Sequence, residues 1–369
     1  MGALLDPFGI GDAREREESW RYSRNALRAL EQLDLGPADS SAALPGELIE
    51  RFDWPETRAA RLVFVNGFCA ESHSRVDGRI QVEHEGARSV IRLAGARRLH
   101  LVFASTPGAA AVRWQREINI EVAQHGELIE HHVGSAGPDV LGSLDCRVNL
   151  APGADFDLAV LTDLPDSVSL YRRASASIER AATLRSTAAL FGGRMQRHDL
   201  GVSLGGAGAR YTARGAFALR ARQHVDVHLD VRHAARDTVS DVLWRGVADQ
   251  RARGILHGAI TVAAGADGAD ARLQTKNLLL SPHAEIDAQP VLEIYADDVK
   301  ASHGATVGQL DERALFYLRS RGVALADARA LLIGGFCREA FAGLADVGLT
   351  ARLDAALARR LPGSGGAAP

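Results

Sequence analysis

Residues 224–232 read HVDVHLDVR, and apolar and polar side chains alternate through the whole stretch. Val225, Val227, Leu229 and Val231 share one face of an extended chain, because successive side chains of a strand point to opposite sides. Alternation of period two indicates a β-strand with one face in the protein core. This stretch therefore predicts β-structure in the middle of the chain.

Similar short runs extend in both directions from this strand. They begin near Arg61 and continue to about Tyr295, separated by turns that contain glycine or aspartate. Such spacing is typical of a sandwich, a barrel or a β-solenoid. We favour the solenoid, because aromatic residues are only 5% of the chain and the stacked coils of a narrow prism need small inward side chains. No fixed repeat is visible, so we expect irregular coils.

Helical patterns flank the β region. Within 13–33, apolar residues recur on one face of a helix, and Gly36-Pro37 ends it. After the β region, Asp311 is placed to cap a helix whose buried face would hold Leu315, Phe316 and Leu318. Two more helices are predicted, over about 326–341 and around the leucines of 349–361.

Four regions follow from these patterns. We predict an N-terminal helical segment at 1–60, a mainly β core at 61–304, a C-terminal helical domain at 305–361 and a flexible tail at 362–369.

Composition excludes several classes of protein. The 369 residues carry 43 Lys and Arg against 46 Asp and Glu, a net charge of −3, so a nucleic-acid partner is not expected. Cys69, Cys146 and Cys337 are far apart, which argues against a disulfide framework and a self-contained zinc site. No signal peptide and no membrane span of about 18 apolar residues is visible. We expect a soluble cytoplasmic protein.

The usual catalytic and metal-binding signatures are missing. There is no GxxxxGK[ST], GxSxG or HExxH, so the chain is not expected to bind ATP by itself. His224 and His228 would face one side about 13 Å apart, too far to share a metal. We interpret them as a solvated polar face. The adjacent His131 and His132 would point to opposite faces.

The stretch 277–322 reads NLLLSPHAEIDAQPVLEIYADDVKASHGATVGQLDERALFYLRSRG. This stretch resembles the C-terminal signature of the SufB/SufD family of iron–sulfur cluster assembly proteins. The SufD branch is favoured because Gly304 follows the histidine, where SufB-like chains usually have glutamate. Trp20-Arg21-Tyr22-Ser23 is also similar to an N-terminal motif of SufD.

The resemblance implies a right-handed parallel β-helix with helical segments at both ends. It also implies a non-enzymatic scaffold subunit that pairs with a SufB-like subunit and binds a SufC-like ATPase. The alternatives are a SufB-like chain or a homodimeric scaffold, which this chain could also form when alone, or a β-helix enzyme acting on polysaccharides. Clustered Asp, Arg or Lys on one sheet face and an aromatic sugar platform would mark the enzyme, and the chain has no such platform.

Candidate site residues cluster at the end of the β region. The resemblance implies no tightly bound cofactor but a transient iron–sulfur cluster at the SufB interface, for which His303 is the candidate ligand because Ala301 replaces the cysteine of many relatives. A purely structural role for His303 in the loop is equally open.

Two partner-binding surfaces are predicted near His303. We expect Leu292, Ile294 and Val299 to lie at a sheet edge that pairs with the partner. Arg319 and Arg321 are expected to contact the ATPase.

Overall fold

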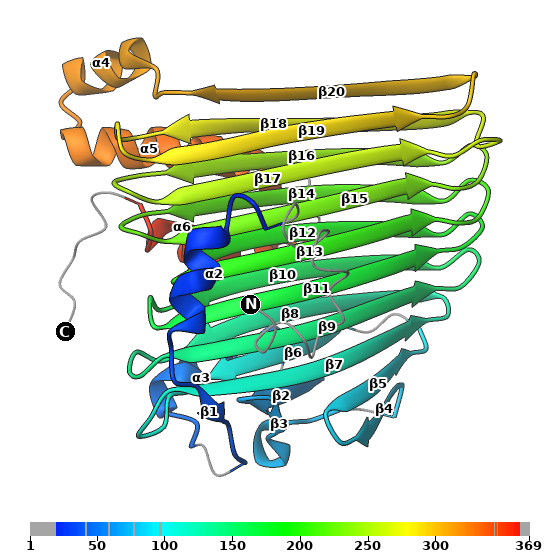
Figure 1. The fold of residues 1–369 in the computed structure, drawn as a ribbon, viewed down its shortest axis with the longest axis horizontal. Coiled ribbons are helices and arrows are strands. Elements are labelled where there is room, and N and C mark those ends of the chain that lie inside the picture. The colour runs from blue at the N-terminus through cyan, green and yellow to red at the C-terminus, as the bar shows by residue number, and fades with distance from the viewer. Residues whose placement is uncertain are drawn as a thin grey trace.

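The computed structural model describes residues 20–40, 43–57, 60–76, 78–95, 98–342, 344 and 346–361. Strands dominate this part of the chain, and helices occur only near its two ends (Figure 1). The helix predicted over 13–33 lies partly outside the described residues. Its described part is α2, Arg24–Glu31.

The strands form two sheets of ten strands each within the described residues. The first sheet, called sheet A, contains β1 (Gly36–Pro37), β4 (Ile80–Glu85), β5 (Arg88–Leu93), β7 (Val112–Val122), β9 (Val140–Leu150), β11 (Val168–Ile178), β13 (Met195–Leu204), β15 (His224–His233), β17 (Arg253–Val262) and β19 (Glu285–Ile294). The second, sheet B, contains β2 (Arg61–Val65), β3 (Phe68–Cys69), β6 (Arg98–Ser105), β8 (His125–Gly134), β10 (Asp155–Leu164), β12 (Thr183–Gly192), β14 (Arg210–Leu219), β16 (Val239–Ala248), β18 (Ala269–Leu279) and β20 (Val299–Gly308).

From β5 to β20, successive strands alternate between the two sheets, and each strand pairs in parallel with the strand two places away in the chain. Asp155 of β10 lies beside Thr183 of β12, and Thr183 lies beside Arg210 of β14. The chain therefore climbs through stacked two-strand coils, and Figure 1 shows that it climbs in a right-handed sense. The predicted parallel β-helix is confirmed.

The core lies between the two sheets and is filled from both. In β15, the predicted inward residues Val225, Val227, Leu229 and Val231 are all buried in the largest hydrophobic cluster. The apolar residues in the sequence are thus the ones whose side chains point between the two sheets, since every second side chain of a strand points to the same side.

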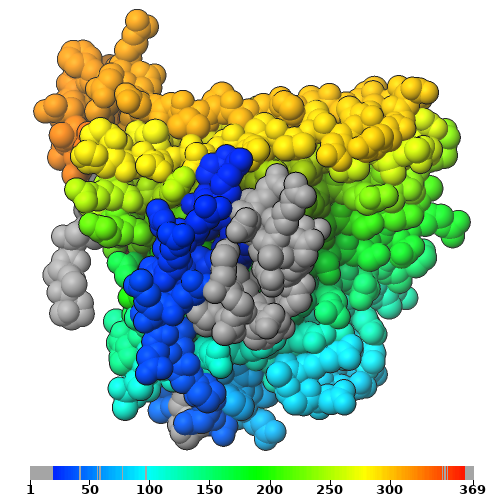
Figure 2. All heavy atoms as spheres, in the orientation of Figure 1, coloured from blue at the N-terminus to red at the C-terminus, as the bar shows by residue number. Residues whose placement is uncertain are grey.

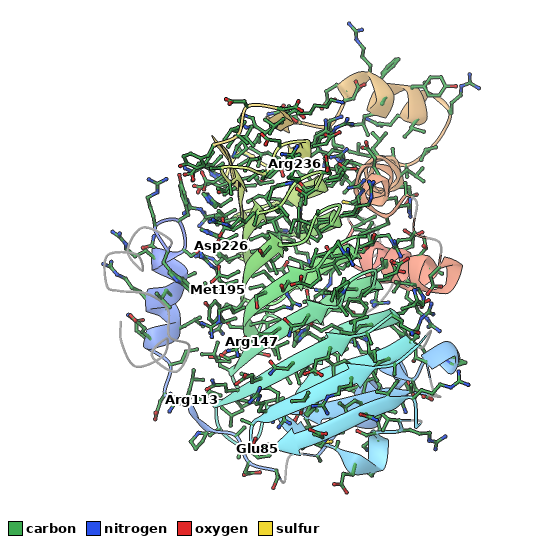
Figure 3. All side chains as sticks on the ribbon, turned by 90° about the vertical axis from the view of Figure 1, so that its right-hand side faces the viewer. Glu85, Arg113, Arg147, Met195, Asp226 and Arg236 are labelled. Atoms are coloured by element: carbon green, nitrogen blue, oxygen red, sulfur yellow. The ribbon has the colours of Figure 1, made fainter. Side chains whose placement is uncertain are left out.

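Helices cover the outer face of each sheet. α2 packs on sheet A against Leu141, Tyr171 and Met195. On sheet B lie α3 (Gly46–Phe52), α5 (Leu325–Arg338), η4 (Glu339–Phe341) and α6 (Val347–Ala358). Figure 3 shows these helices on opposite sides of the stacked coils. The short 3₁₀ turns are η2 (Pro55–Thr57) and η3 (Glu71–His73), and α4 (Glu312–Ser320) follows β20.

Two details differ from the predicted regions. The last strand, β20, runs to Gly308 rather than ending at residue 304. The C-terminal helices share a buried cluster with the outer face of sheet B, where Ile333 and Leu357 meet Phe191. They are therefore a cover on the β-helix rather than an independent unit with its own core. The tail predicted at 362–369 lies outside the described residues.

Candidate functional site at the end of the β-helix

The β-helix ends in two strands that each have one neighbour only among the described residues. β19 pairs with β17, and β20 pairs with β18. Alternate residues of a parallel strand direct their backbone groups to the same neighbour. Tyr295 donates its N–H to Val262 at 2.9 Å, so the residues of the other set, including Leu292 and Ile294, direct their N–H groups to the open edge. Pro290, which has no N–H, belongs to this open set, as expected of proline in an edge strand.

The open edge of β20 can be identified in the same way. Asp270 of β18 donates its N–H to Thr238, which directly precedes β16, at 2.9 Å. The residues before and after Asp270 therefore direct their backbone N–H and C=O groups to β20. The register then directs the backbone groups of Val299 and His303 away from β18, to the open edge. The three residues predicted for partner contact through backbone pairing therefore all belong to open edges, while the pairing itself stays a prediction.

The inward side chains of the last coil are apolar, with one exception. They continue the buried columns of the coil below, and the register pairs are Leu292 with Ile260, Ile294 with Val262, Val299 with Ala269 and His303 with Leu273. All four residues of the lower coil are buried, whereas Ile294 is 44% exposed. The end of the β-helix is thus an uncovered section through the core, with His303 as its one titratable inward residue.

The opposite end of the β-helix is built differently. There the sheets finish in antiparallel hairpins, in which β4 pairs with β5 and β2 pairs with β3. The outer strand β4 exposes Glu83 and Glu85, and charged edge strands discourage pairing between chains. In the part of the chain that the structure describes, only the C-terminal end therefore combines open parallel edges with apolar inward side chains.

His303 lies in the middle of β20, so the prediction that it sits in a loop is wrong. Gly304 suggested a loop, but the continuous register with β18 holds the residue in the sheet. His303 is exposed, and Ala301 lies on the same side of the strand, about 7 Å away along the chain. No group of three His, Cys, Asp or Glu side chains in the described residues could hold a metal.

The helix α4 projects beyond the last strand (Figures 1 and 2). Asp311 caps it as predicted, since its carboxylate accepts the N–H groups of Arg313 and Ala314. Leu315 is buried, but Phe316 is 75% exposed, so the predicted buried face is wrong at Phe316. No other element covers that side of α4 within the described residues, and the amphipathic pattern alone does not reveal this.

The exposed side of α4 combines aromatic and basic groups. Tyr317 is 58% exposed, and the guanidinium of Arg321 lies 5.1 Å from its ring centre. Arg319 is exposed in the last turn of the helix. Exposed aromatic and arginine side chains are the residue types enriched at protein interfaces. The predicted pair Arg319 and Arg321 is thus accessible, and Phe316 and Tyr317 add apolar area.

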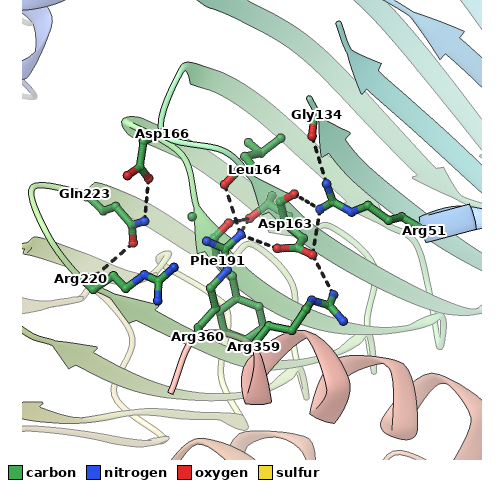
Figure 4. A network of polar contacts seen from close by, with 12 residues as sticks. Arg51, Gly134, Asp163, Leu164, Asp166, Phe191, Arg220, Gln223, Arg359 and Arg360 are labelled. Carbon is green, nitrogen blue, oxygen red and sulfur yellow. Dashed lines mark hydrogen bonds and ion pairs between the residues drawn. The ribbon is translucent and has the colours of Figure 1, made fainter. Parts of the chain in front are cut away.

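One buried carboxylate fastens the C-terminal helices to the β-helix (Figure 4). Asp163 of β10 forms ion pairs with Arg51 at 2.8 Å, with Arg359 at 2.7 Å and with Arg360. Burial alone would raise the pKa of Asp163, but the guanidinium groups of Arg360, Arg51 and Arg359 hold it well below its usual value. The three arginines come from the ends of the sequence and are far from Asp163 in the chain, so no local pattern could have predicted this cluster.

The WRYS motif at 20–23 is buried against sheet A. Trp20 lies over the guanidinium of Arg197 at 4.5 Å, and Ser23 forms hydrogen bonds with His224, at 2.7 Å, and with Asp226. Burial lowers the pKa of His224 to about 4. The solvated polar face predicted for β15 is therefore wrong at His224 and Asp226, because α2 and the turn before it cover it.

His131 and His132 point to opposite faces, as predicted. His132 lies inside the β-helix and contacts Glu130 at 2.7 Å, while Arg172 holds the same carboxylate through two hydrogen bonds, of 2.6 and 2.8 Å. His131 lies outside, with its ring centre 5.0 Å from that of Trp54. Burial lowers the pKa of His131 to about 3, so this imidazole is neutral at pH 7.

Comparison with known proteins agrees with this architecture. The family described as SUF system FeS cluster assembly, SufBD core domain, matches residues 106–336. The chain belongs to the SufB/SufD family. It is 37% identical over 183 residues to the iron–sulfur cluster assembly protein SufD of Escherichia coli, a match that covers 49% of this chain and 43% of that protein. These similarities place it in the SufD branch.

Two further relatives extend the match. A SufBD family protein of Mycobacterium tuberculosis is 28% identical over 383 residues, covering 98% of this chain and 93% of that protein. SufD of Bacillus subtilis is 27% identical over 210 residues, covering 56% of this chain and 48% of that protein. In the described part of the chain, no helix combines the length and apolar character needed to cross a membrane.

Proposed function

We propose that this chain is the SufD-like scaffold subunit of a cytoplasmic assembly that builds iron–sulfur clusters, and that it is not itself an enzyme. The observation that carries the proposal is the bare C-terminal end of the β-helix. This end has two open parallel edges, an apolar section through the core and one histidine. A second β-helix that covers it would pair with the edges and bury the apolar section. The nascent cluster is the cargo of such an assembly rather than a resident cofactor of this chain.

The partner at this end is a SufB-like subunit in the proposal. Strand addition at β19 and β20 would satisfy the outward N–H and C=O groups and cover Leu292, Ile294 and Val299. His303 then lies at the seam, where a neutral imidazole can bind iron together with ligands from the partner. A homodimer is the alternative in the absence of that subunit, because a two-fold axis can bring identical edges together.

The second partner is a SufC-like ATPase that docks on α4. Phe316 and Tyr317 supply the apolar contact, and Arg319 and Arg321 surround it. The chain contains no GxxxxGK[ST], so a subunit of this kind depends on a separate chain for ATP hydrolysis.

Co-expression with SufB-like and SufC-like proteins of the same organism tests the proposal. A tagged wild-type chain should retain both partners through affinity and size-exclusion chromatography, and neither partner co-eluting would refute the assignment. Removing 310–361 would uncover the buried outer face of sheet B, so a point variant is the sharper probe of the helix. Phe316→Ala should weaken ATPase retention while leaving the SufB-like subunit bound. Leu331→Ala, in α5 and 54% exposed, is a matched apolar control.

A further inference from the structure

The turns that lead from sheet B to sheet A stack along one edge of the β-helix. In the turns 220–223 and 249–252, Ala221 and Gln250 both have left-handed backbone conformations, with φ of 56° and 58°. Arg251 donates its N–H to Ala221 at 3.0 Å, and Arg253 donates to Gln223 at 2.9 Å. Backbone hydrogen bonds therefore hold the two turns in a fixed relation, one coil apart.

Basic side chains lie along this stack of turns, and the second turn also holds the carboxylate of Asp249. Arg222 and Arg251 occupy equivalent positions in adjacent turns, about 4.8 Å apart as neighbouring strands are. His283 follows in the next turn, and all three are exposed. Among the described residues, the side chains of Arg220, Arg222 and Arg251 form no ion pair or hydrogen bond. Like charges placed side by side are unfavourable, and the carboxylate of Asp249 accepts the N–H of Gln250 and forms no ion pair with these arginines in the described residues.

Two arginines on the sheet faces of the same coils are paired. Arg214 binds Asp241 at 2.6 Å, and Arg253 binds Asp287 at 2.9 Å. Arg210 of β14 and Arg232 of β15 form no ion pair in the described residues, so the turns are not the sole place where these coils carry unpaired arginines.

The basic turns continue into the end of the C-terminal helices. Arg220, Asp249 and Arg360 line one pocket of about 160 Å³, together with Ile333 of α5. The Nε of Arg360 is buried there without a hydrogen-bond partner. Arg360 also shares the single carboxylate of Asp163 with two other arginines, so positive charge exceeds negative charge at this point (Figure 4). We define the basic edge as Arg220, Arg222, Arg251, His283, Arg359 and Arg360.

We propose that the basic edge is a second docking surface for the SufC-like ATPase, which binds it through an acidic helix. This inference rests on the proposed function. The edge lies beside α5 and the end of α6, at the end of the stacked coils from which α4 also projects (Figure 1). Carboxylates three or four residues apart on a helix are about 5–6 Å apart, which matches one coil of the β-helix.

The features of the edge favour a protein over a nucleic acid. A single-stranded nucleic acid needs aromatic groups on which bases can stack, and the residues that define the edge include no Phe, Tyr or Trp. The net negative charge of the chain would also repel an extended phosphate backbone.

Charge reversal tests the proposal. In the double variant Arg222→Glu/Arg251→Glu, the dissociation constant for the purified ATPase should rise about tenfold or more at 0.05 M salt, because interfacial charges that turn repulsive weaken binding. The rise should shrink to about threefold or less at 0.5 M salt, where screening is strong. The matched control Arg180→Glu/Arg210→Glu reverses two exposed arginines near the opposite row of turns and should change binding less than about twofold.

The outcomes separate this inference from the proposed function. Unchanged ATPase affinity in the Arg222→Glu/Arg251→Glu variant, with weakened binding in Phe316→Ala, would overturn the basic edge alone. A reversal that weakens only the SufB-like subunit would also overturn it, because the occupant would be the wrong partner. A wild-type chain that fails to bind the ATPase would overturn both proposals. Circular dichroism of every variant should match the wild type, since the reversed side chains are exposed.

Discussion

Asp163→Asn should weaken the attachment of the end of α6 to the β-helix. The substitution keeps the shape of the side chain and removes its charge. Asp163 is 5% exposed, and its three arginine partners differ in exposure, with Arg360 at 13%, Arg51 at 32% and Arg359 at 57%. The most buried of the three guanidinium groups, that of Arg360, would lose its counterion.

The free energy lost in Asp163→Asn can be estimated from the exposure of each arginine. Removing one partner of a buried ion pair costs about 3–5 kcal/mol, whereas an exposed pair contributes about 0–1 kcal/mol. We take about 3 kcal/mol as the total, since only the contact with Arg360 is well buried. A factor of ten corresponds to about 1.4 kcal/mol, so amide exchange through local opening of α6 should accelerate roughly 150-fold.

Native-state hydrogen exchange measured element by element is the assay. Amides of α6 should lose protection in Asp163→Asn while those of β13 to β17 keep theirs. Asp166→Asn is the matched control, because Asp166 lies three residues away, is exposed, and bonds only to Gln223 in the described residues. Unchanged protection of α6 would refute the reasoning, and so would an equal loss across the whole β-helix.

The hydrogen-exchange protection of α6 should fall as the solution is made acidic. The pKa of Asp163 is lowered in the folded protein, so its ionised form stabilises the fold. The contribution is complete above the unfolded-state pKa of about 4 and is lost as the pH falls below that value toward the folded pKa. Protection of α6 should therefore be constant from pH 7 to about 5 and decline in acid, and this decline should be absent in Asp163→Asn.

Further predictions concern the end of the β-helix. Ile294→Pro removes an N–H that points to the open edge, so the monomer should fold and the complex with the SufB-like subunit should weaken, as read by size-exclusion chromatography. Glu293→Pro is the control, because it removes an N–H that donates to β17 and should lower the melting temperature of the monomer. If a folded Ile294→Pro variant still binds the SufB-like subunit at full strength, the interface lies elsewhere. His303→Ala should leave subunit stoichiometry intact and reduce the iron and sulfide content of the purified complex, whereas His303→Cys should keep part of it, because thiolate is a good iron ligand. A normal cluster yield in His303→Ala would exclude an essential ligand, and loss of both cluster and complex would indicate a structural role.

The sequence predicts the β-helix well because its core obeys one simple rule. Small and β-branched residues at every second position, as in 224–232, require a buried face along each strand, and the structure buries that face. The boundary at residue 304 is wrong because Gly304 and Gly308 resemble loop residues, while hydrogen bonding to β18 holds them in a strand. Pairing with an already formed strand thus overrides the local preference of glycine.

The outer surfaces are less predictable, because whether they face solvent depends on distant segments. His224 and Asp226 belong to a polar face by pattern, yet α2 and Trp20 bury them. Phe316 belongs to an apolar face by pattern, yet no described element covers it. The Asp163 cluster joins residues more than 100 positions apart, so only the fold brings them together.

The position of α4 connects the two proposed partner surfaces. β20, which contains His303, ends at Gly308, and α4 begins at Glu312, so only three residues separate the strand from the helix. Beyond α4, the chain is fixed again, since α5 and α6 pack on sheet B and the end of α6 is held by Asp163. A protein that pulls on the exposed side of α4 therefore acts against one anchored end and one edge strand. In the chain alone, β20 is hydrogen-bonded on one side only, to β18. Pairing of its open edge with the SufB-like subunit would therefore strengthen the attachment on the strand side of α4.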